Sequence, residues 1–543
     1  MNRFYSLLLA FSVALSFSLH AQGKFFRADT ISVQKDDAGG YGNIVAGVDF
    51  DKDGKPEIYA CNSNATDVES SLIPRLYKFE LNKGKWELVW STSIDGTWQN
   101  TWPALTYGDL DKDGKMEIIW GPANWVDDAH ANPARILVFE AKGDGSDNMG
   151  VDFFGTSLPN AKYTITTANK VDMRPIHWFV TDVDNDGKNE LVYADRQAGT
   201  GLSFGIVSVD KIPDNGDGSE VWTLEMNGKD ASMAGLNTLS KYDIVLLNSI
   251  LYLFDGSGNI TPIKFQNNTW KLLPTQTNIA GTTGSFKGAT VVDIDKDGKK
   301  EIVFGGWSDG KAYLCKQQGD TLVAFQIGNF AKLGVTRLNG AGAGDLDGDG
   351  KLDFAFGSRN TTATKVFDAV VRLQYKGGAI TDSNSYVPTV IDSLIHPNTG
   401  QLDIVCVANV DTDSLPEVLY SSGYPRGTLD SPNIPIVILK YKSATSVKMQ
   451  DNKTPESFYL TQNFPNPFNP TTNIKFGLPN ATVVTLKVFN VLGQEITTLI
   501  NNEQLAAGPY NVDFNASGLS SGTYIYQLRY ENQIISKKMQ LLK

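Results

Sequence analysis

The sequence predicts an all-β protein, a seven-bladed β-propeller followed by a small antiparallel β-sandwich. Three observations predict this fold class. A nine-residue acidic motif recurs through the first three quarters of the chain, a short apolar run of strand length follows each copy, and period-two alternation begins after residue 457. The 51 glycines and 20 tyrosines are scattered along the 543 residues, which favours many short strands joined by turns.

Residues 1–21 are predicted to be a secretory signal peptide. Arg3 supplies the positive start, residues 4–19 are mainly apolar, and cleavage is expected after Ala21. This run is too short for a comfortable membrane span, and no later stretch approaches the ~20 apolar residues of a transmembrane helix. The mature chain is therefore expected to be exported and to have no transmembrane segment.

The acidic motif divides residues 22–445 into units. It occurs as DFDKDGKPE at 49–57, DLDKDGKME at 109–117, DVDNDGKNE at 182–190, DIDKDGKKE at 293–301 and DLDGDGKLD at 345–353, with a decayed copy, NVDTDSLPE, at 409–417. The gap after the third copy is two units wide, and its middle (235–258) holds a similar strand pair without the acidic residues. Counting that pair gives seven units.

Each unit contains about four strand candidates, one before the acidic loop and three after it, as in one propeller blade. A closed ring of seven blades leaves few exposed strand edges. Residues 24–33 are expected to complete the ring by pairing into the blade that contains 402–442. A β-solenoid is the structural alternative, but units of more than 50 residues with internal hairpins disfavour it.

The acidic loops are predicted to bind Ca²⁺. Carboxylates at positions 1, 3 and 5 repel one another unless a cation joins them, Gly at position 6 permits a sharp turn, position 7 offers its backbone carbonyl, and the acid at position 9 closes the shell. All-oxygen ligation favours Ca²⁺ over Mg²⁺ and excludes zinc. The predicted metal ligands are Asp49, Asp51, Asp53, Lys55, Glu57, Asp109, Asp111, Asp113, Lys115, Glu117, Asp182, Asp184, Asp186, Lys188, Glu190, Asp293, Asp295, Asp297, Lys299, Glu301, Asp345, Asp347, Asp349, Lys351 and Asp353.

The formal net charge of −12 argues against nucleic acid or an anionic membrane as partner. Five bound Ca²⁺ ions would offset most of this charge, so the acidity is mainly ligand charge. About five structural calcium sites are therefore expected, and no catalytic residue is assigned to the loops, because no copy offers a nucleophile or base beside an open coordination position.

Over about residues 40–440 these units resemble FG-GAP/VCBS repeats, the calcium-loop blades of integrin α-chain propellers and of many bacterial secreted proteins. The five intact loops carry this resemblance; the fourth and seventh units depart from the pattern. The resemblance implies that each loop joins the first two strands of a blade on one face. Segments after the second strand then emerge on the opposite face.

Aromatic, charged and amide side chains are frequent in those opposite segments, and such groups suit sugar rings or a protein partner. The candidate ligand-binding residues are Trp125, Asp127, Asp128, His130, Arg196, Trp307, Asp309, Arg359 and Arg426. Packing between blades is an alternative role for the tryptophans, and it is favoured for Trp98 and Trp102.

An enzymatic function stays open. GLSFG at 201–205 matches a nucleophile-elbow pattern but lacks the strand–turn–helix context, and GAGAGD at 340–345 is expected to be a strand entering a calcium loop. Some calcium-bearing propellers are polysaccharide lyases, and His130 or His177 is the candidate base for such a reaction. Cys61, Cys315 and Cys406 are expected to be free thiols, with a Cys61–Cys406 disulfide as the alternative.

The C-terminal segment 458–543 follows a polar linker at 446–457 and is predicted to be a β-sandwich of about seven strands. Its motifs QNFPNPFNPTT (462–472), VFNVLGQE (488–495), AAGPY (506–510), SGTYIYQL (521–528) and KKMQLLK (537–543) closely resemble the type A sorting domain of the type IX secretion system of Bacteroidetes-like bacteria. A retained carbohydrate-binding sandwich is the alternative.

This resemblance implies passage through the outer membrane of a Gram-negative bacterium, removal of the domain, and release or surface attachment of the remainder. The expected function is extracellular recognition by a secreted or cell-surface propeller, through adhesion or through binding of a glycan or a surface protein. The alternative is a lyase-like polysaccharide-degrading enzyme, and a purely structural envelope component ranks third.

Overall fold

The computed structural model describes residues 25–32, 34, 40–63, 73–94, 98–99, 103–122, 124–125, 134–165, 174–196, 203–236, 239–359, 366–396, 404–411, 413, 415–421, 435–441, 448–449, 455, 457–516, 519–531 and 533–542. The expected signal peptide lies outside these residues. The chain divides into two compact units, Met1–Lys440 and Tyr441–Lys543. No helix among the described residues is long and apolar enough to span a membrane.

The described part of the first unit contains seven four-stranded antiparallel sheets, one of which has an additional short strand. The first three sheets consist of β2 (Tyr41–Val48), β3 (Glu57–Asn62), β4 (Arg75–Asn82) and β5 (Lys85–Ser93); of β7 (Ala104–Gly108), β8 (Glu117–Gly121), β10 (Ile136–Glu140) and β13 (Ala161–Tyr163); and of β14 (Pro175–Thr181), β15 (Glu190–Asp195), β16 (Phe204–Val209) and β17 (Trp222–Asn227). The fourth and fifth consist of β18 (Lys241–Leu247), β19 (Ile250–Asp255), β20 (Asn259–Gln266) and β21 (Thr269–Leu272), with the short β22 (Gln276–Thr277) paired to β20; and of β24 (Ser285–Val292), β25 (Glu301–Gly306), β26 (Lys311–Gln318) and β27 (Thr321–Asn329). The sixth and seventh consist of β28 (Leu338–Gly344), β29 (Asp353–Ser358), β30 (Val366–Tyr375) and β31 (Tyr386–His396); and of β32 (Ile404–Ala408), β33 (Glu417–Ser421), β34 (Ile436–Tyr441) and β1 (Phe25–Ile31).

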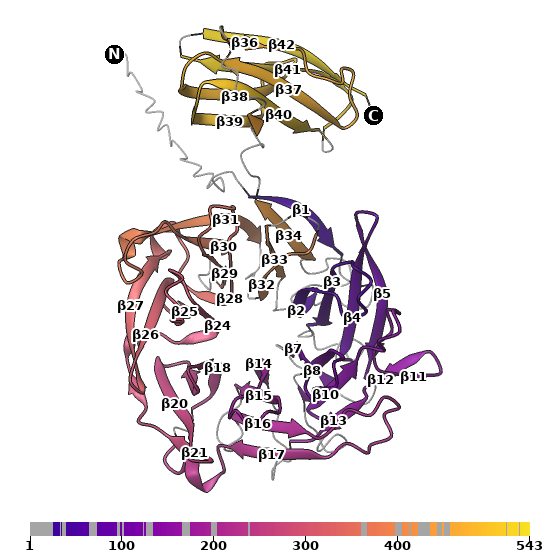
Figure 1. The fold of residues 1–543 in the computed structure, drawn as a ribbon, viewed down its shortest axis with the longest axis vertical. Helices are drawn as coiled ribbons and strands as arrows, with labels where there is room; N and C mark the ends of the chain where they lie inside the picture. Colours follow the sequence, from indigo (N-terminus) through magenta and orange to yellow (C-terminus); the bar gives the residue numbers. More distant parts are fainter. Residues whose placement is uncertain are drawn as a thin grey trace, which may run out of the picture. The chain divides into compact units, whose positions relative to one another are not determined.

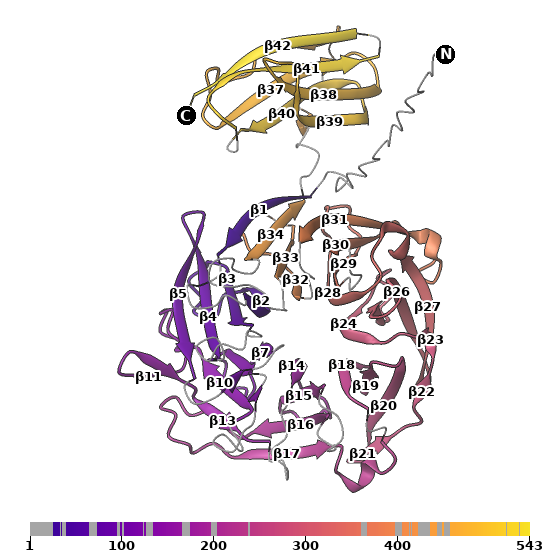
Figure 2. The ribbon, with the colours of Figure 1, turned by 180° about the vertical axis from the view of Figure 1, so that it is seen from behind.

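The sheets stand around a common centre as the blades of a propeller. In both views the first strand of a sheet is innermost and later strands lie progressively outward, except that the last sheet has β32 innermost and β1 at its outer edge (Figures 1 and 2). Each inner strand contacts the inner strand of the next blade, and the contacts run in a closed circle through β2, β7, β14, β18, β24, β28 and β32. The predicted all-β propeller class is confirmed.

Strand β1 completes the last blade. It pairs with β34 at the outer edge of the sheet β1-β34-β33-β32, as predicted for residues 24–33. Ile31 is buried in the core between the first and last blades, and the Arg27 guanidinium forms two bonds, of 2.7 and 3.0 Å, to the carboxylate of Asp392 on β31. The two ends of the propeller sequence are thereby joined in one sheet.

The fourth blade shows why its sequence lacks the acidic loop. Strands β18 and β19 are joined by Asn248 and Ser249 alone, and both residues have positive φ angles (49° and 61°). Two residues of this conformation form a tight hairpin turn. The blade therefore replaces a nine-residue loop by a two-residue turn.

Close approach of inner strands explains the small residues in GAGAGD. This segment belongs largely to β28, as predicted, and a Cβ atom on Gly342 would lie 2.5 Å from the side chain of Val407 on the next blade. Only glycine allows this contact. The SFG of GLSFG enters strand β16 and is followed by further strand, which excludes a nucleophile elbow.

The first unit also contains shorter elements outside the seven sheets. The short strands are β6 (Trp98–Gln99), which pairs with β9 (Asn124–Trp125), β11 (Val151–Phe153), which pairs with β12 (Thr156–Leu158), and β23 (Ile279–Thr282); the described helices are the 3₁₀ turns η2 (Ala231–Met233), η3 (Ala331–Leu333) and η4 (Ser383–Ser385). Cys61, Cys315 and Cys406 are free thiols, as predicted.

The second unit is a sandwich of two four-stranded sheets. One consists of β35 (Lys448–Met449), β40 (Gly508–Asn515), β37 (Thr471–Leu478) and β36 (Tyr459–Leu460), and the other of β39 (Glu495–Leu505), β38 (Thr482–Asn490), β41 (Gly522–Tyr530) and β42 (Gln533–Leu541). A single apolar core lies within this unit. Lys448 and Met449, which the sequence predicts as linker, pair with β40.

Candidate functional site

Each acidic loop connects the inner strand of a blade to the second strand. Within every intact loop the backbone N–H of the position-6 glycine donates to the first aspartate, at 2.8–3.1 Å, and the N–H of position 7 donates to the third aspartate, at 2.8–3.0 Å. Position 6 has a positive φ angle, 86° at Gly54, for example, which glycine adopts readily because it has no Cβ. The spacing of the motif thus forms a tight turn that gathers its carboxylates.

The acid at position 9 lies inside the propeller. Glu57, Glu117, Glu190, Glu301 and Asp353 are all at most 1% exposed at the start of the second strand. In four of the five loops one oxygen of this carboxylate accepts a hydrogen bond from the backbone N–H of position 2, at 2.7–3.1 Å. In the loops at 109–117 and 182–190 the other oxygen has no donor among the described residues and remains available to a metal ion.

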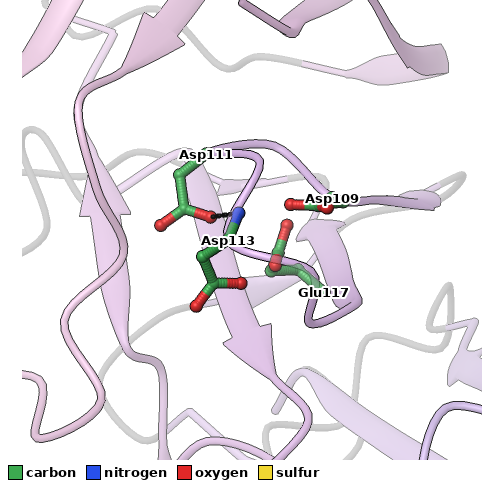
Figure 3. A group of neighbouring side chains, drawn as sticks. All are labelled: Asp109, Asp111, Asp113 and Glu117. Atoms are coloured by element: carbon green, nitrogen blue, oxygen red, sulfur yellow. Dashed lines mark hydrogen bonds between the residues drawn. The ribbon is translucent and has the colours of Figure 1, made fainter.

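The loop at 109–117 presents the most complete carboxylate cage. One oxygen from each of Asp109, Asp111, Asp113 and Glu117 lies within 4.8 Å of the others, and Figure 3 shows the four side chains around a common space. Asp109 Oδ1 and Glu117 Oε1 are buried and have no hydrogen-bond donor among the described residues. Burial raises the pKa of Glu117 to about 9.

The loop at 182–190 has the same features. Asp182, Asp184 and Glu190 form a cluster in which Asp182 Oδ1 and Glu190 Oε1 are buried without a donor. Burial raises the pKa of Glu190 to about 8. Buried carboxylate oxygens without donors are costly unless a cation is bound, so the residues of both loops fit Ca²⁺.

The loop at 293–301 gathers Asp293, Asp295 and Asp297 in a third cluster. Its closing residue, Glu301, is approached by the Lys316 ammonium at 3.5 Å, which is longer than a close ion pair. This donor set also fits Ca²⁺.

The first loop, 49–57, contains a lysine from the same blade. Lys78 on β4 is 1% exposed, and its ammonium lies 2.7 Å from both Asp51 Oδ2 and Glu57 Oε1. It also lies 2.9 Å from Asp147. Burial lowers the pKa of Lys78, but the bonds to Asp51 and Glu57 raise it more, so the net shift is upward. A positive charge of the protein therefore neutralises carboxylates that the sequence assigns to a metal.

Arg372 on β30 likewise neutralises carboxylates of the loop 345–353. Its guanidinium lies 2.5 Å from Asp347 and 2.7 Å from Asp353, and all three side chains are almost fully buried. In the decayed loop, Lys440 contacts Asp411, Asp413 and Glu417. Sequence reasoning missed Lys78 and Arg372, although a basic residue within an otherwise apolar strand is a signal that could have identified them.

The opposite end of the blades is defined by backbone hydrogen bonds. The residue after the second strand donates to the residue before the inner strand: Arg196 N–H to Arg174 C=O (3.0 Å), Trp307 to Gly284 (3.0 Å) and Arg359 to Arg337 (3.4 Å). Because the acidic loops join the other ends of these strands, these residues lie on the face opposite the loops.

Aromatic and cationic side chains meet on this face. Trp307 stacks on Phe286 with ring centroids 4.4 Å apart, and Phe286 contacts Tyr242 at 5.1 Å. The guanidinium carbons of Arg337 and Arg359 lie 5.4 and 5.3 Å from the centre of the Trp307 ring. Trp307 thus packs against its neighbours as well as lying on the predicted face.

The other candidate residues have varied surroundings. Asp309 accepts hydrogen bonds from the Lys311 N–H (3.1 Å) and the Tyr313 hydroxyl (2.5 Å), which stabilise the β25–β26 turn. Trp125 lies opposite Trp98 in the register of β9 and β6. Asp127, Asp128, His130 and Arg426 lie outside the described residues, as does Trp102.

His177, the candidate base, is held by a buried carboxylate. Its Nδ1 lies 2.5 Å from Asp243 Oδ1. Asp243 is 0% exposed, and its second oxygen accepts hydrogen bonds from the Ser285 hydroxyl and the backbone N–H groups of Gly288 and Ala289. An acceptor carboxylate at Nδ1 keeps the proton there and leaves Nε2 as the basic atom.

His177 also lines a cavity of about 570 Å³ between the inner strands of three blades. Its walls come from β14, β18 and β24, where His177 and Thr181 are polar, and from the acidic-loop end of the blades, where Asn248 and Ser249 of the β18–β19 turn and Gly298 and Lys300 of the loop 293–301 contribute. The volume lies within the ~300–1,000 Å³ range of ligand-binding clefts.

Comparisons with family models matched two kinds of segment in the chain. The family model of the FG-GAP-like repeat matches residues 49–120 and 293–356, and that of the secretion system C-terminal sorting domain matches residues 462–541. A search of curated proteins found no match.

Several solved structures are distantly similar. They include Saccharomyces cerevisiae Sqt1 (8% identity, 82% of this chain and 96% of that chain, TM-score 0.41) and the α-L-arabinofuranosidase Arb93A of Fusarium graminearum (10%, 77% and 98%, 0.39). A third is the intramolecular trans-sialidase of Ruminococcus gnavus (11%, 76% and 96%, 0.34).

The repeat matches cover blades that contain intact acidic loops, and the sorting-domain match covers most of the second unit. The chain is therefore a type IX-secreted extracellular protein that joins an FG-GAP-repeat β-propeller to a C-terminal sorting domain.

Proposed function

We propose that the propeller recognises an extracellular glycan through the face opposite its acidic loops. The observation that supports this most directly is the gathering of Trp307, Arg337 and Arg359 there. Aromatic and guanidinium groups on a rigid scaffold are typical of recognition surfaces. A surface protein as partner is the competing form of this proposal.

In this proposal calcium stabilises the scaffold and takes no part in ligand contact. The loops at 109–117, 182–190 and 293–301 hold Ca²⁺, and each ion cancels the repulsion among buried carboxylates at the start of a second strand. In the loops at 49–57 and 345–353, Lys78 and Arg372 supply part of that positive charge. Calcium affinity is therefore lower at these two of the five predicted sites.

The test of recognition is retention of the purified full chain on immobilised polysaccharides in the presence of calcium. We expect retention on at least one polymer class, and a reduction of that retention by Trp307→Ala with the fold intact by circular dichroism. Failure of every polymer to retain folded protein would exclude glycan recognition and direct attention to a protein partner.

A second candidate function, polysaccharide lyase, is favoured by the His177–Asp243 pair at the cavity. In such a reaction a base removes the proton beside a uronate carboxylate, the bond to the leaving sugar oxygen breaks, and the electron pair forms a C=C bond. His177 Nε2 would accept the proton, and Asp243 would stabilise the imidazolium through Nδ1–H.

Elimination produces an unsaturated sugar that absorbs in the near ultraviolet. We expect any such absorbance to be lost in His177→Ala and reduced about 10²–10⁴-fold, the usual contribution of a general base, in His177→Gln. Retention of an acidic polymer without absorbance would exclude the lyase and leave recognition in place.

A further inference from the structure

Four arginines gather on the face opposite the acidic loops, although they belong to two blades that are not adjacent. Arg174 and Arg196 stand before β14 and after β15, and Arg337 and Arg359 stand before β28 and after β29. In each pair a backbone hydrogen bond joins the two residues, at 3.0 and 3.4 Å. These are equivalent positions in two copies of the repeat, so the chain repeats the same double-arginine arrangement.

The two pairs influence each other across the ring. Burial, followed by the charge of Arg174, lowers the pKa of Arg196 to about 10, and Arg359 contributes in the same direction. Arg359 belongs to the sixth sheet along the chain and Arg196 to the third. Arg196 and Arg359 therefore lie near enough to interact electrostatically, although their blades are not adjacent.

An aromatic row contacts the second pair and a residue close in sequence to the first. Tyr242, Phe286 and Trp307 contact one another in sequence, and Ile176, two residues after Arg174, packs in the same cluster. Arg337 and Arg359 lie over the Trp307 ring. Stacking on a ring fixes the plane of a guanidinium. An arginine held in this way loses less conformational entropy when it binds a planar anion.

Like charges that gather repel one another, and an anion bound among them would reduce that repulsion. Each guanidinium has five N–H donors, so an arginine that also bonds to protein retains donors for a ligand. Acidic neighbours are present too: Asp195 is buried beside Arg196, and Asp243 bonds to His177. Arg337 and Arg359 lie over the Trp307 ring, and Arg174 and Arg196 occupy the equivalent positions of a second blade.

We propose that Arg174, Arg196, Arg337 and Arg359 form a binding site for an anionic sugar, one that carries a carboxylate or a sulfate. This rests on the glycan-recognition function proposed above and specifies its ligand class. The aromatic rings of Tyr242, Phe286 and Trp307 beside the arginines suit the apolar face of the sugar ring. Bidentate arginine contacts suit its carboxylate or sulfate.

The experiment compares charged probes with neutral forms of the same polymers, using the full chain in calcium. The probes are a short oligogalacturonate and its methyl ester, and dextran sulfate and dextran. We expect calorimetry to detect binding of the oligogalacturonate or of the dextran sulfate, and no binding of either neutral form. The responses to the two charged probes separate carboxylate from sulfate as the recognised group.

Variants test whether the arginines are responsible. Arg196→Gln should weaken binding about tenfold or more, the loss of one charge-assisted hydrogen bond, while the exposed Arg529→Gln in the second unit, with the same change in charge, should alter it less than about twofold. Arg196→Lys, which keeps the charge, should bind more tightly than Arg196→Gln and serves if the glutamine variant does not fold.

Three results would overturn the inference. Equal binding of neutral and charged forms, unaffected by Arg196→Gln, would disprove the anionic class and leave glycan recognition intact. Binding of no polysaccharide would disprove both proposals. Binding of polyglutamate in place of the sugars would assign the arginines to an acidic protein partner.

Discussion

Lys78 and Arg372 show how single residues modify a repeated motif. The five intact loops share the Asp-x-Asp-x-Asp-Gly core, yet in two of them a buried cation from the third strand of the blade contacts the inner carboxylates. Breaking a buried ion pair by removing one partner costs far more than breaking an exposed one, since the remaining charges stay buried. These residues are therefore expected to affect stability as strongly as core residues.

Replacement of Lys78 by Met should lower the free energy of unfolding by about 3–5 kcal/mol in chelator, because Asp51 and Glu57 lose their buried partner. Excess calcium should recover part of this loss by binding the same carboxylates. Denaturant unfolding with and without calcium measures both effects. Lys85→Met, at an exposed position on β5, is the control and should change stability by less than about 0.5 kcal/mol. An equal loss in both media would show that the loop takes no calcium.

The pH dependence of the calcium-free protein should have an unusual direction. Burial raises the folded-state pKa of Glu117 from 4.5 to about 9 and that of Glu190 to about 8. The folded state then holds these protons more tightly than the unfolded state. The contribution is fully present below pH 4.5 and is lost as pH rises through about 8–9.

In chelator, stability should therefore decline across that window, and the difference between calcium-loaded and calcium-free protein should widen. Thermal unfolding from pH 5 to 9 checks this, with Glu117→Gln as the comparison, which should flatten the decline. A calcium-free stability that does not change over this range would contradict the buried, protonated state of Glu117.

At the scale of elements, strand β1 shows how the propeller closes. It is separated from its sheet partners by nearly the whole first unit, yet Ile31 is 4% exposed and belongs to the core between first and last blades. A strand that only lay along an exposed edge of the sheet would contribute little to the free energy of unfolding.

Ile31→Ala should cost about 2–5 kcal/mol, as expected for a large-to-small change in a core. Phe26→Ala on the same strand, where the side chain is 45% exposed, should cost less than about 0.5 kcal/mol. Chemical denaturation of the two variants distinguishes a structural closing strand from a peripheral one. Similar small effects of both substitutions would argue against closure by β1.

At the scale of the whole molecule, the two units are expected to differ in their dependence on metal. All the intact acidic loops lie in Met1–Lys440, whereas the second unit has a separate apolar core of its own. Ligand binding to the folded state alone stabilises by an amount set by saturation, about 2.7 kcal/mol per site at 100-fold excess over Kd.

Chelator should therefore lower the unfolding temperature of the propeller while leaving the transition of the second unit in place. Differential scanning calorimetry of the full chain resolves the two transitions, and added magnesium in place of calcium is the control. A single transition that shifts as a whole would mean that the second unit also depends on calcium.

The sequence alone was sufficient for features that are local. A nine-residue loop contains its own turn glycine, its spaced carboxylates and its closing acid, so its geometry follows from neighbouring residues, and the loops form as predicted. The blade pattern and the sorting domain are likewise recognisable from contiguous segments of the sequence. The closing role of residues 24–33 was expected because a propeller usually closes with one strand from each end of its sequence in a shared blade.

Tertiary structure decided what depends on register between distant strands. Lys78 reaches Asp51 across 27 residues, and Arg372 reaches Asp347 across 25, because strand pairing sets both beside a loop. The arginine cluster and the His177–Asp243 pair join different blades. No local pattern encodes these contacts, since they arise only when the ring closes and brings the inner ends of its strands together.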